Sequence, residues 1–333
     1  MSGRERLLAI ETSCDETAAA VVDPEMNVLS SVVHSQAPTH AKFGGVVPDV
    51  ASREHVARIV DIVDAALEQA DTTPDQLAAV AVTKGPGLPG SLAVGVSAAK
   101  SLALGWDLPL VAVNHLEGHL FSVELGGEPV AYPAVILLVS GGHCMLVHAH
   151  ERGAYELLGQ TRDDSVGEAY DKVARELDLG YPGGPILDKL AAEGEDVYAL
   201  PRPLLDDPGL DFSFSGLKTA VRRLLEKAEV DVPNLAASFA AASTDVLVAK
   251  TKRAVERCRP ASVIAVGGVS ASPILRRRLV EEVEPLGVQV VLAPLRYATD
   301  NAAMIGAAAW WRLRHDGPSD PGFGPSPRLP LGA

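Results

Sequence analysis

Two histidines four residues apart are the side chains of this sequence best suited to chemistry. His115 and His119 lie in the segment 114–119, directly after a strand-like run at 110–113. Residues i and i+4 share one face of a helix, so both imidazoles can reach a single metal ion. The zincin motif has glutamate directly after its first histidine, whereas Leu116 follows here, which disfavours metal-assisted peptide hydrolysis.

A third metal ligand has to come from elsewhere in the chain. Asp300 opens a helix-like segment, 300–306, and is the best candidate. With the two histidines it would complete a two-histidine, one-carboxylate face with open positions for substrate. The alternative for such a histidine pair is a surface or a satisfied core position. The sequence therefore predicts a metal centre at His115, His119 and Asp300.

The composition predicts a soluble, cytoplasmic protein without a membrane segment. The 333 residues are 47% hydrophobic and 22% charged, enough for a large core in about two domains. The apolar run 134–139 is too short to cross a bilayer, Lys100 interrupts the run after Leu92, and no secretory core follows the charged N-terminus. Three distant cysteines indicate neither a disulfide framework nor a thiolate metal site.

The net charge of -14 conflicts with unaided binding to nucleic acid, because phosphates are neutralised by basic side chains. A nucleic-acid substrate would need local basic patches or partner subunits. The candidate patches are Lys218, Arg222 and Arg223, then Lys250, Lys252, Arg253 and Arg257, and finally 276–278. The alternative for each patch is a solvated helical face.

The elements that position these residues follow the same order twice. The first half predicts strands at 7–13, 17–23 and 28–34, a helix at 48–70, a strand at 77–83, a helix at 91–104, a strand at 110–113 and the histidine helix. The second half predicts strands at 134–140, 144–150 and 155–161, extra helices between 165 and 257, a strand at 263–266, a helix at 273–283, a strand at 288–292 and a last helix from Asp300.

This duplicated order predicts an α/β protein of the actin, sugar-kinase and Hsp70 type (ASKHA), with two lobes, mixed sheets and a central cleft. The predicted domains are 1–125 with 296–333, and 126–295 with the inserted helices. The Pro- and Gly-rich tail, 315–333, is expected to pack as an irregular strap or to be mobile.

Several turns are candidates for ligand binding. The first strand of each half ends in a small polar turn, at 11–17 and at 140–143, and the two glycines of the second turn let backbone amides approach a phosphate. A plain hairpin turn is the alternative for either. The turn 267–272 precedes a helix and has the form of a nucleotide contact. The loop 85–90 matches GxGxxG, but no acid ends the next strand, which favours a structural role.

Ordered motifs across nearly the whole chain resemble the universal threonylcarbamoyladenosine synthesis family in its bacterial form. The motifs lie at 10–17, 44–48, 51–55, 85–90, 114–119, 138–143, 167–175 and 211–218. The resemblance implies transfer of a threonylcarbamoyl group from threonylcarbamoyl-AMP to N6 of the adenosine beside the anticodon, in tRNAs that read codons starting with A.

The resemblance also implies site residues. His115, His119 and Asp300 would hold a divalent metal ion, usually assigned as iron, with Zn²⁺ and Mg²⁺ left open. The residues that would line the substrate site are Leu138, Val139, Ser140, Gly141, Gly142, Asp171, Gly184, Asp188 and Ser272. Ser272 stands where the family usually has asparagine, so this chain keeps a hydroxyl there and lacks the amide.

The mechanistic hypothesis is acyl transfer to a weakly nucleophilic aryl amine. A metal ion would polarise the threonylcarbamoyl group, the amides of 140–142 would stabilise the developing charge, and Asp15 or Glu16 would accept the amine proton. The resemblance implies assembly with TsaB and TsaE and supply of the adenylate by TsaC. Two other hypotheses stay open: an ATP-dependent phosphotransferase or carbamoyltransferase of the same fold, and a non-enzymatic nucleotide-gated scaffold.

Overall fold

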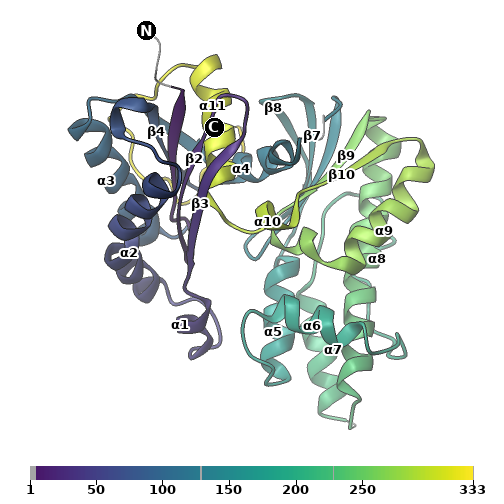
Figure 1. Ribbon diagram of the computed structural model, residues 1–333. Coiled ribbons are helices and arrows are strands. Elements are labelled where there is room, and N and C mark those ends of the chain that lie inside the picture. The colour runs from purple at the N-terminus through teal and green to yellow at the C-terminus, as the bar shows by residue number, and fades with distance from the viewer. Residues whose placement is uncertain (1–4, 128–129, 228, 333) are drawn as a thin grey trace. The chain divides into compact units, whose positions relative to one another are not determined.

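The computed structural model describes residues 5–127, 130–227 and 229–332, which form two compact units (Figure 1). Unit 1 consists of the described residues up to 127 and those from Asp300 onward. Unit 2 consists of the described residues from 130 to Thr299. Each unit is built on one five-stranded mixed sheet.

The sheet of unit 1 has the strand order β3-β2-β1-β4-β5. Its strands are β1 (Arg6–Glu11), β2 (Glu16–Val22), β3 (Val28–Ser35), β4 (Leu77–Gly85) and β5 (Leu110–Asn114). Strands β1, β2 and β3 form an antiparallel meander, whereas β1, β4 and β5 are parallel. From Leu7 to Glu11 every residue of β1 is buried, because helices cover both faces of the sheet.

Two helices pack on each face of this sheet. Helices α2 (Pro48–Gln69) and α3 (Pro89–Gly105) lie beside one another on the face that includes Leu8 and Ile10 (Figure 1). Helices α4 (His115–Phe121) and α11 (Ala302–His315) lie on the opposite face with Ala9. The smaller elements are α1 (Ala37–Ala41), η1 (Pro74–Gln76) and η2 (Ser122–Gly126). Helix α11 begins two residues later than predicted, because Asn301 caps it by accepting a hydrogen bond from Met304 N at 2.9 Å.

The tail after Gly317 is the predicted irregular strap. It runs along the edge strand β5, where Ser319 N donates to Leu110 O at 2.8 Å, and along β4, where Ser326 N donates to Lys84 O at 2.7 Å. A Cβ at Gly85 would lie 1.9 Å from Ser326 O, and its φ is +154°. The GxGxxG loop is therefore structural, as predicted, and the strap covers an otherwise open sheet edge.

The sheet of unit 2 repeats the topology of unit 1. Its order is β10-β9-β6-β7-β8, with β6, β7 and β8 antiparallel and β6, β9 and β10 parallel. The strands are β6 (Ala134–Val139), β7 (Cys144–Glu151), β8 (Ala154–Gln160), β9 (Ser262–Val266) and β10 (Gln289–Leu292). The duplication predicted from the hydrophobic pattern is thus confirmed.

Unit 2 carries the inserted helices. They are α5 (Val166–Glu176), α6 (Gly183–Ala191), α7 (Ser215–Leu225) and α8 (Val232–Cys258), followed by η3 (Gly268–Ala271), α9 (Pro273–Val283), η4 (Glu284–Leu286) and α10 (Leu295–Ala298). In the described part of the chain, α8 alone is long and apolar enough to cross a membrane. Of its apolar window 61% is buried inside the structure, as in a core helix.

The prediction of a basic patch on α8 is wrong in part. Lys250 of α8 is fully buried, and its ammonium donates hydrogen bonds to the carbonyl oxygens of Asp207 at 2.8 Å and Gly209 at 2.6 Å. Arg253 likewise donates to Asp207 O at 2.8 Å. These cations satisfy backbone carbonyls of the surface loop 205–209, so the buried Lys250 is not available to a nucleic acid.

Candidate metal centre

The structure brings together the three side chains that the sequence predicts as metal ligands. Asp300 Oδ1 lies 3.2 Å from His119 Nε2 and 3.6 Å from His115 Nε2. The ligand atoms all lie within 4.8 Å of one another. Because metal–nitrogen and metal–oxygen bonds of such ions are about 2.0–2.2 Å, a single ion fits among the three atoms.

Helix α4 is fixed against α11, whose N-terminus carries the carboxylate of this cluster. Asn114 caps α4 by accepting from Leu116 N at 3.0 Å. The fully buried Glu117 forms a two-point ion pair with Arg312 of α11, at 2.8 and 3.1 Å. A Cβ at Gly118 would lie 2.6 Å from the Ile305 side chain, so the two helices are in close contact there.

The histidines differ in how the protein holds them. The His119 ring is fully buried, and neither of its nitrogens has a hydrogen-bond partner among the described residues; its approach to Asp300 lacks hydrogen-bond geometry. His115 Nδ1 lies 3.1 Å from Glu11 Oε2, which leaves Nε2 directed to the cluster. Burial opposes a charge on His115, but Asp300 and Glu11 outweigh it and raise its pKa to about 9.

The turn after β1 lies next to this cluster and carries both predicted proton acceptors. Asp15 is buried, with 7% of its surface exposed. Burial, together with the charges of Asp15 and Asp300, raises the pKa of Glu16 well above its ordinary value. Glu11, at the start of the turn, behaves oppositely: despite burial, its ion pair and hydrogen bond with His115 lower the pKa of its carboxyl.

His55 of α2 holds this turn through two hydrogen bonds, a role that the sequence alone did not reveal. Its Nε2 lies 2.9 Å from Cys14 O and its Nδ1 lies 2.8 Å from Thr17 Oγ1. A carbonyl can only accept, so Nε2 carries the proton and Nδ1 accepts from the threonine hydroxyl. Burial lowers the pKa of His55, although the Cys14 carbonyl opposes this, which favours the neutral ring.

The hydrogen bonds continue from His55 into the loop before α2. Gln36 Nε2 lies 3.4 Å from His55 Nδ1, and Gln36 Oε1 lies 3.1 Å from His40 Nε2. Val47 N donates to His40 Nδ1 at 3.3 Å, which fixes the proton of His40 on Nε2. The sequence signal for His55 was its place on the buried stripe of α2, four residues from both Ala51 and Ile59.

In unit 2 the predicted phosphate-binding turn has an open backbone. Ser140 N donates to His143 O at 2.7 Å, which closes the turn. A Cβ added at Gly141 or Gly142 would meet no atom within 4 Å. Leu138 and Val139 are fully buried in β6, so any ligand contact of theirs would use the main chain.

The remaining predicted substrate residues lie on α5, α6 and the turn before α9. Asp171 Oδ1 accepts from Gly183 N at 2.8 Å and so anchors the start of α6, beside Gly184. Asp188 Oδ1 and Ser272 Oγ are buried and have no partner of hydrogen-bond geometry in the described residues. Burial raises the pKa of Asp188, although Ser272 opposes the shift. Asp188 also lines a pocket of about 450 Å³.

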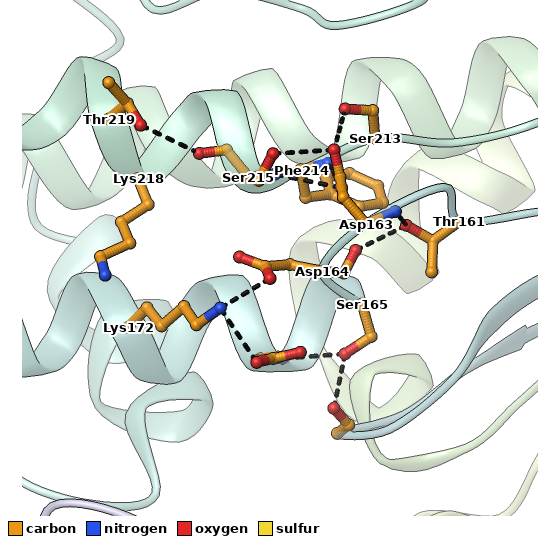
Figure 2. Close-up of polar contacts among 12 residues, drawn as sticks. Thr161, Asp163, Asp164, Ser165, Lys172, Ser213, Phe214, Ser215, Lys218 and Thr219 are labelled. Atoms are coloured by element: carbon orange, nitrogen blue, oxygen red, sulfur yellow. Dashed lines mark hydrogen bonds and ion pairs between the residues drawn. The ribbon is translucent and has the colours of Figure 1, made fainter.

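Asp163 organises the segment between these residues and α7, and the sequence analysis missed it. Figure 2 shows its carboxylate facing Ser213 and Ser215, whose hydroxyls donate at 2.5 and 2.7 Å, while Phe214 N donates at 2.8 Å. These bonds lower the pKa of Asp163 even though partial burial acts in the opposite direction. Ser165, two residues later, donates to Gly141 O. The motif at 211–218 is thereby tied to the predicted phosphate-binding turn.

Comparison with known proteins decides the family. A family model described as TsaD, tRNA N6-adenosine threonylcarbamoyltransferase, matches residues 27–307. The chain belongs to the TsaD family. The tRNA N6-adenosine threonylcarbamoyltransferase of Halalkalibacterium halodurans is 50% identical over 314 residues, 93% of this chain and 91% of that protein. The Geobacillus thermodenitrificans protein of the same name is 48% identical over 334 residues, 98% of this chain and 96% of its own.

Solved structures support the fold assignment. Full-length HypF, with 13% identity, gives a TM-score of 0.62 over 95% of this chain and 48% of its own. The ROK hexokinase of Thermus thermophilus, also 13% identical, gives 0.52 over 93% of this chain and 99% of its own. The predicted ASKHA fold is confirmed, and membership of the TsaD family sets aside the phosphotransferase and scaffold hypotheses.

Proposed function

We propose that this chain transfers the threonylcarbamoyl group of threonylcarbamoyl-AMP to N6 of the adenosine 3′ to the anticodon, at a metal centre formed by His115, His119 and Asp300. The chain is a tRNA-modifying transferase, as its family and its curated relatives are. The observation that carries the metal centre is the His119 ring, fully buried and without a hydrogen bond in the described residues, 3.2 Å from a carboxylate.

The donor set supports a transition-metal ion, and we assign it as iron(II). Two imidazoles and one carboxylate with open positions are the usual ligands of non-haem iron, and zinc accepts the same donors. Magnesium prefers oxygen ligands and fits less well. Glu11 supports either metal, because its bond to His115 Nδ1 directs Nε2 to the ion. Once bound, the cation would polarise the carbonyl group that is transferred.

Unit 2 supplies the residues for the adenylate in this proposal. The backbone at Gly141 and Gly142 suits a phosphate, because the two glycines leave it uncovered, whereas the Ser140 amide is already bonded to His143 O. Asp188 and Ser272 offer buried polar atoms that lack partners of hydrogen-bond geometry in the described residues and could bond the nucleoside. Asp171 would position Gly184 through its bond to the neighbouring amide. Leu138 and Val139 would contribute main-chain atoms.

Glu16 is better suited than Asp15 to take the proton of the attacking amine. A general base works best with a pKa near the operating pH, and burial beside two other carboxylates raises the pKa of Glu16 in that direction. Asp15 would then supply part of the negative field that keeps Glu16 basic. Both side chains lie on the turn held by His55.

The proposal is tested by reconstitution of the full chain with TsaB, TsaE, TsaC, threonine, ATP and unmodified tRNA, with nucleoside mass spectrometry as the readout. His119→Ala should lose the metal ion bound at this cluster and should form no threonylcarbamoyladenosine. His34→Ala is the matched control, because this histidine of unit 1 is partly exposed and pairs with Glu54. Wild-type modification by His119→Ala without metal would reject the metal centre. No modification by the complete wild-type system would reject the transfer reaction itself.

The partner subunits remain proposals that rest on the family resemblance and on charge. A net charge of -14 opposes binding of this chain to tRNA phosphates, and Lys250 is buried, although Arg222 and Arg223 are exposed on α7. We propose that TsaB and TsaE supply part of the tRNA-binding surface and that TsaC supplies the adenylate. Binding of labelled tRNA to this chain alone, compared with the mixture, measures that contribution.

A further inference from the structure

A second cluster of metal-ligating side chains lies in unit 2, on strands β7 and β8. His148 and His150 are alternate residues of β7 and project from the same face of the strand. The register pairs His148 with Glu156 of β8 and is interrupted at His150, between Ala149 and Glu151. Such a bulge re-aims a side chain, and here the His150 ring approaches Glu156.

The separations of the donor atoms suit one small cation. Glu156 Oε2 lies 3.4 Å from His150 Nε2 and 3.8 Å from His148 Nδ1, and the three atoms lie within 4.8 Å of one another. Around a tetrahedral zinc ion, donor atoms lie about 3.4 Å apart. The side chains of His150 and Glu156 are 58% and 53% exposed, so both can turn by the small amount required.

His148 is the fixed member of this cluster. Its side chain is 11% exposed, and its Nε2 is buried without a hydrogen-bond partner in the described residues. Its Nδ1 stands at 3.8 Å from the carboxylate, which is beyond hydrogen-bond distance. This separation of His148 Nδ1 and Glu156 Oε2 is too long for a hydrogen bond, but a cation between the two atoms could bind both.

We propose that His148, His150 and Glu156 form a second site, for a divalent transition-metal ion such as Zn²⁺. Two imidazoles and one carboxylate favour zinc, copper or nickel over calcium and magnesium, which prefer oxygen donors. The site belongs entirely to unit 2, whereas the first cluster belongs entirely to unit 1. A bound ion would also join the edge strand β8 to β7 through side chains. Metal analysis of the purified chain would then report the sum of two sites.

The test is a zinc titration of the chelator-stripped full chain against a chromophoric competitor at one pH. The wild type should bind two equivalents. His150→Ala and Glu156→Gln should each lose one equivalent, with at least about 100-fold weaker binding at this site. His119→Ala should lose the other equivalent. His315→Ala is the matched control, because this exposed histidine lies 3.8 Å from the Asp316 carboxylate without a second imidazole, and it should keep both.

Three results would overturn the second site. One is a wild-type stoichiometry of one, with that single equivalent lost in His119→Ala and kept in His150→Ala. Another is a second equivalent that survives both His150→Ala and Glu156→Gln. The third is equal loss of that equivalent in His315→Ala, which would mark non-specific surface binding. The two substitutions change exposed side chains and Glu156→Gln keeps the shape of the residue, so misfolding does not obscure the outcome.

Discussion

Replacement of His55 tests whether the hydrogen bonds that hold the turn 11–17 are needed for catalysis. His55→Leu removes the donor to Cys14 O, which is part-buried, and the acceptor for the Thr17 hydroxyl, which is buried. Each buried group left without a partner costs about 1–3 kcal/mol, so the two together should lower the free energy of unfolding by about 2–6 kcal/mol. Gln36 Nε2 also contacts His55 but keeps its hydrogen bond to Ala51 O at 3.3 Å, so it adds nothing to the expected loss of stability.

His55→Gln separates hydrogen bonding from bulk. A side-chain amide offers one donor and one acceptor at about the spacing of the two ring nitrogens, so this variant should lose less than about 1.5 kcal/mol. Because a misplacement of about 1 Å can lower a rate about 100-fold, His55→Leu should reduce kcat for tRNA modification by one to two orders of magnitude with a smaller change in KM. His55→Gln should restore most of that loss.

The assays are unfolding in urea and steady-state modification of tRNA at a temperature where every variant is folded. His34→Leu is the control, since His34 is 31% exposed and makes its contact with Glu54 outside the turn. The reasoning fails if His55→Leu retains wild-type kcat while folded. It also fails if His55→Gln is as impaired as His55→Leu, because hydrogen bonds would then not be the reason.

Three other perturbations have defined outcomes. Arg312→Met should lower the free energy of unfolding in urea by about 3–5 kcal/mol, because it removes the ion pair between Arg312 and the fully buried Glu117, and adding Glu117→Gln should recover part of that loss. Gly267→Ala should cost about 2–5 kcal/mol in thermal unfolding, since φ is +87° and the new Cβ would lie 2.4 Å from Val139 O. Because His115 has a pKa of about 9, metal binding to chelator-stripped protein should release about one proton from it near pH 7.5 and none above about pH 10. Calorimetry in buffers of different ionisation enthalpy measures this proton release. The same raised pKa stabilises the chelator-stripped fold below about pH 6.5, and this contribution should disappear as the pH rises through about 9.

The sequence predicted the elements whose signal is local. The run 134–139 is continuously apolar and forms the fully buried β6, and the helix expected at 273–283 has those bounds in α9. The last helix was placed two residues early, because the capping role of Asn301 depends on a side-chain rotamer. The convergence of His115, His119 and Asp300 was predicted from donor chemistry, and their role as ligands remains a prediction.

The contacts that the sequence could not predict join residues far apart in the chain. His55 and Cys14 are 41 positions apart, and Asp163 and Ser213 are 50 positions apart. Hydrophobic periodicity predicts helices and strands but not which distant polar groups will form a hydrogen bond. The prediction for Lys250 was wrong for a related reason: its helix has a basic sequence, but a loop whose carbonyl oxygens accept hydrogen bonds from Lys250 covers that side chain.

The strap at the end of the chain contacts α4, the helix that carries His115 and His119, through one amide side chain. Pro330 O accepts a hydrogen bond from Asn114 Nδ2 at 2.7 Å, while the oxygen of the same amide caps the helix that starts at His115. Proteolytic removal of a segment that includes Pro330 would therefore remove this acceptor and disturb the first turn of α4. Loss of activity in a clipped preparation would come from a displaced histidine, even though the cut lies far from it in sequence.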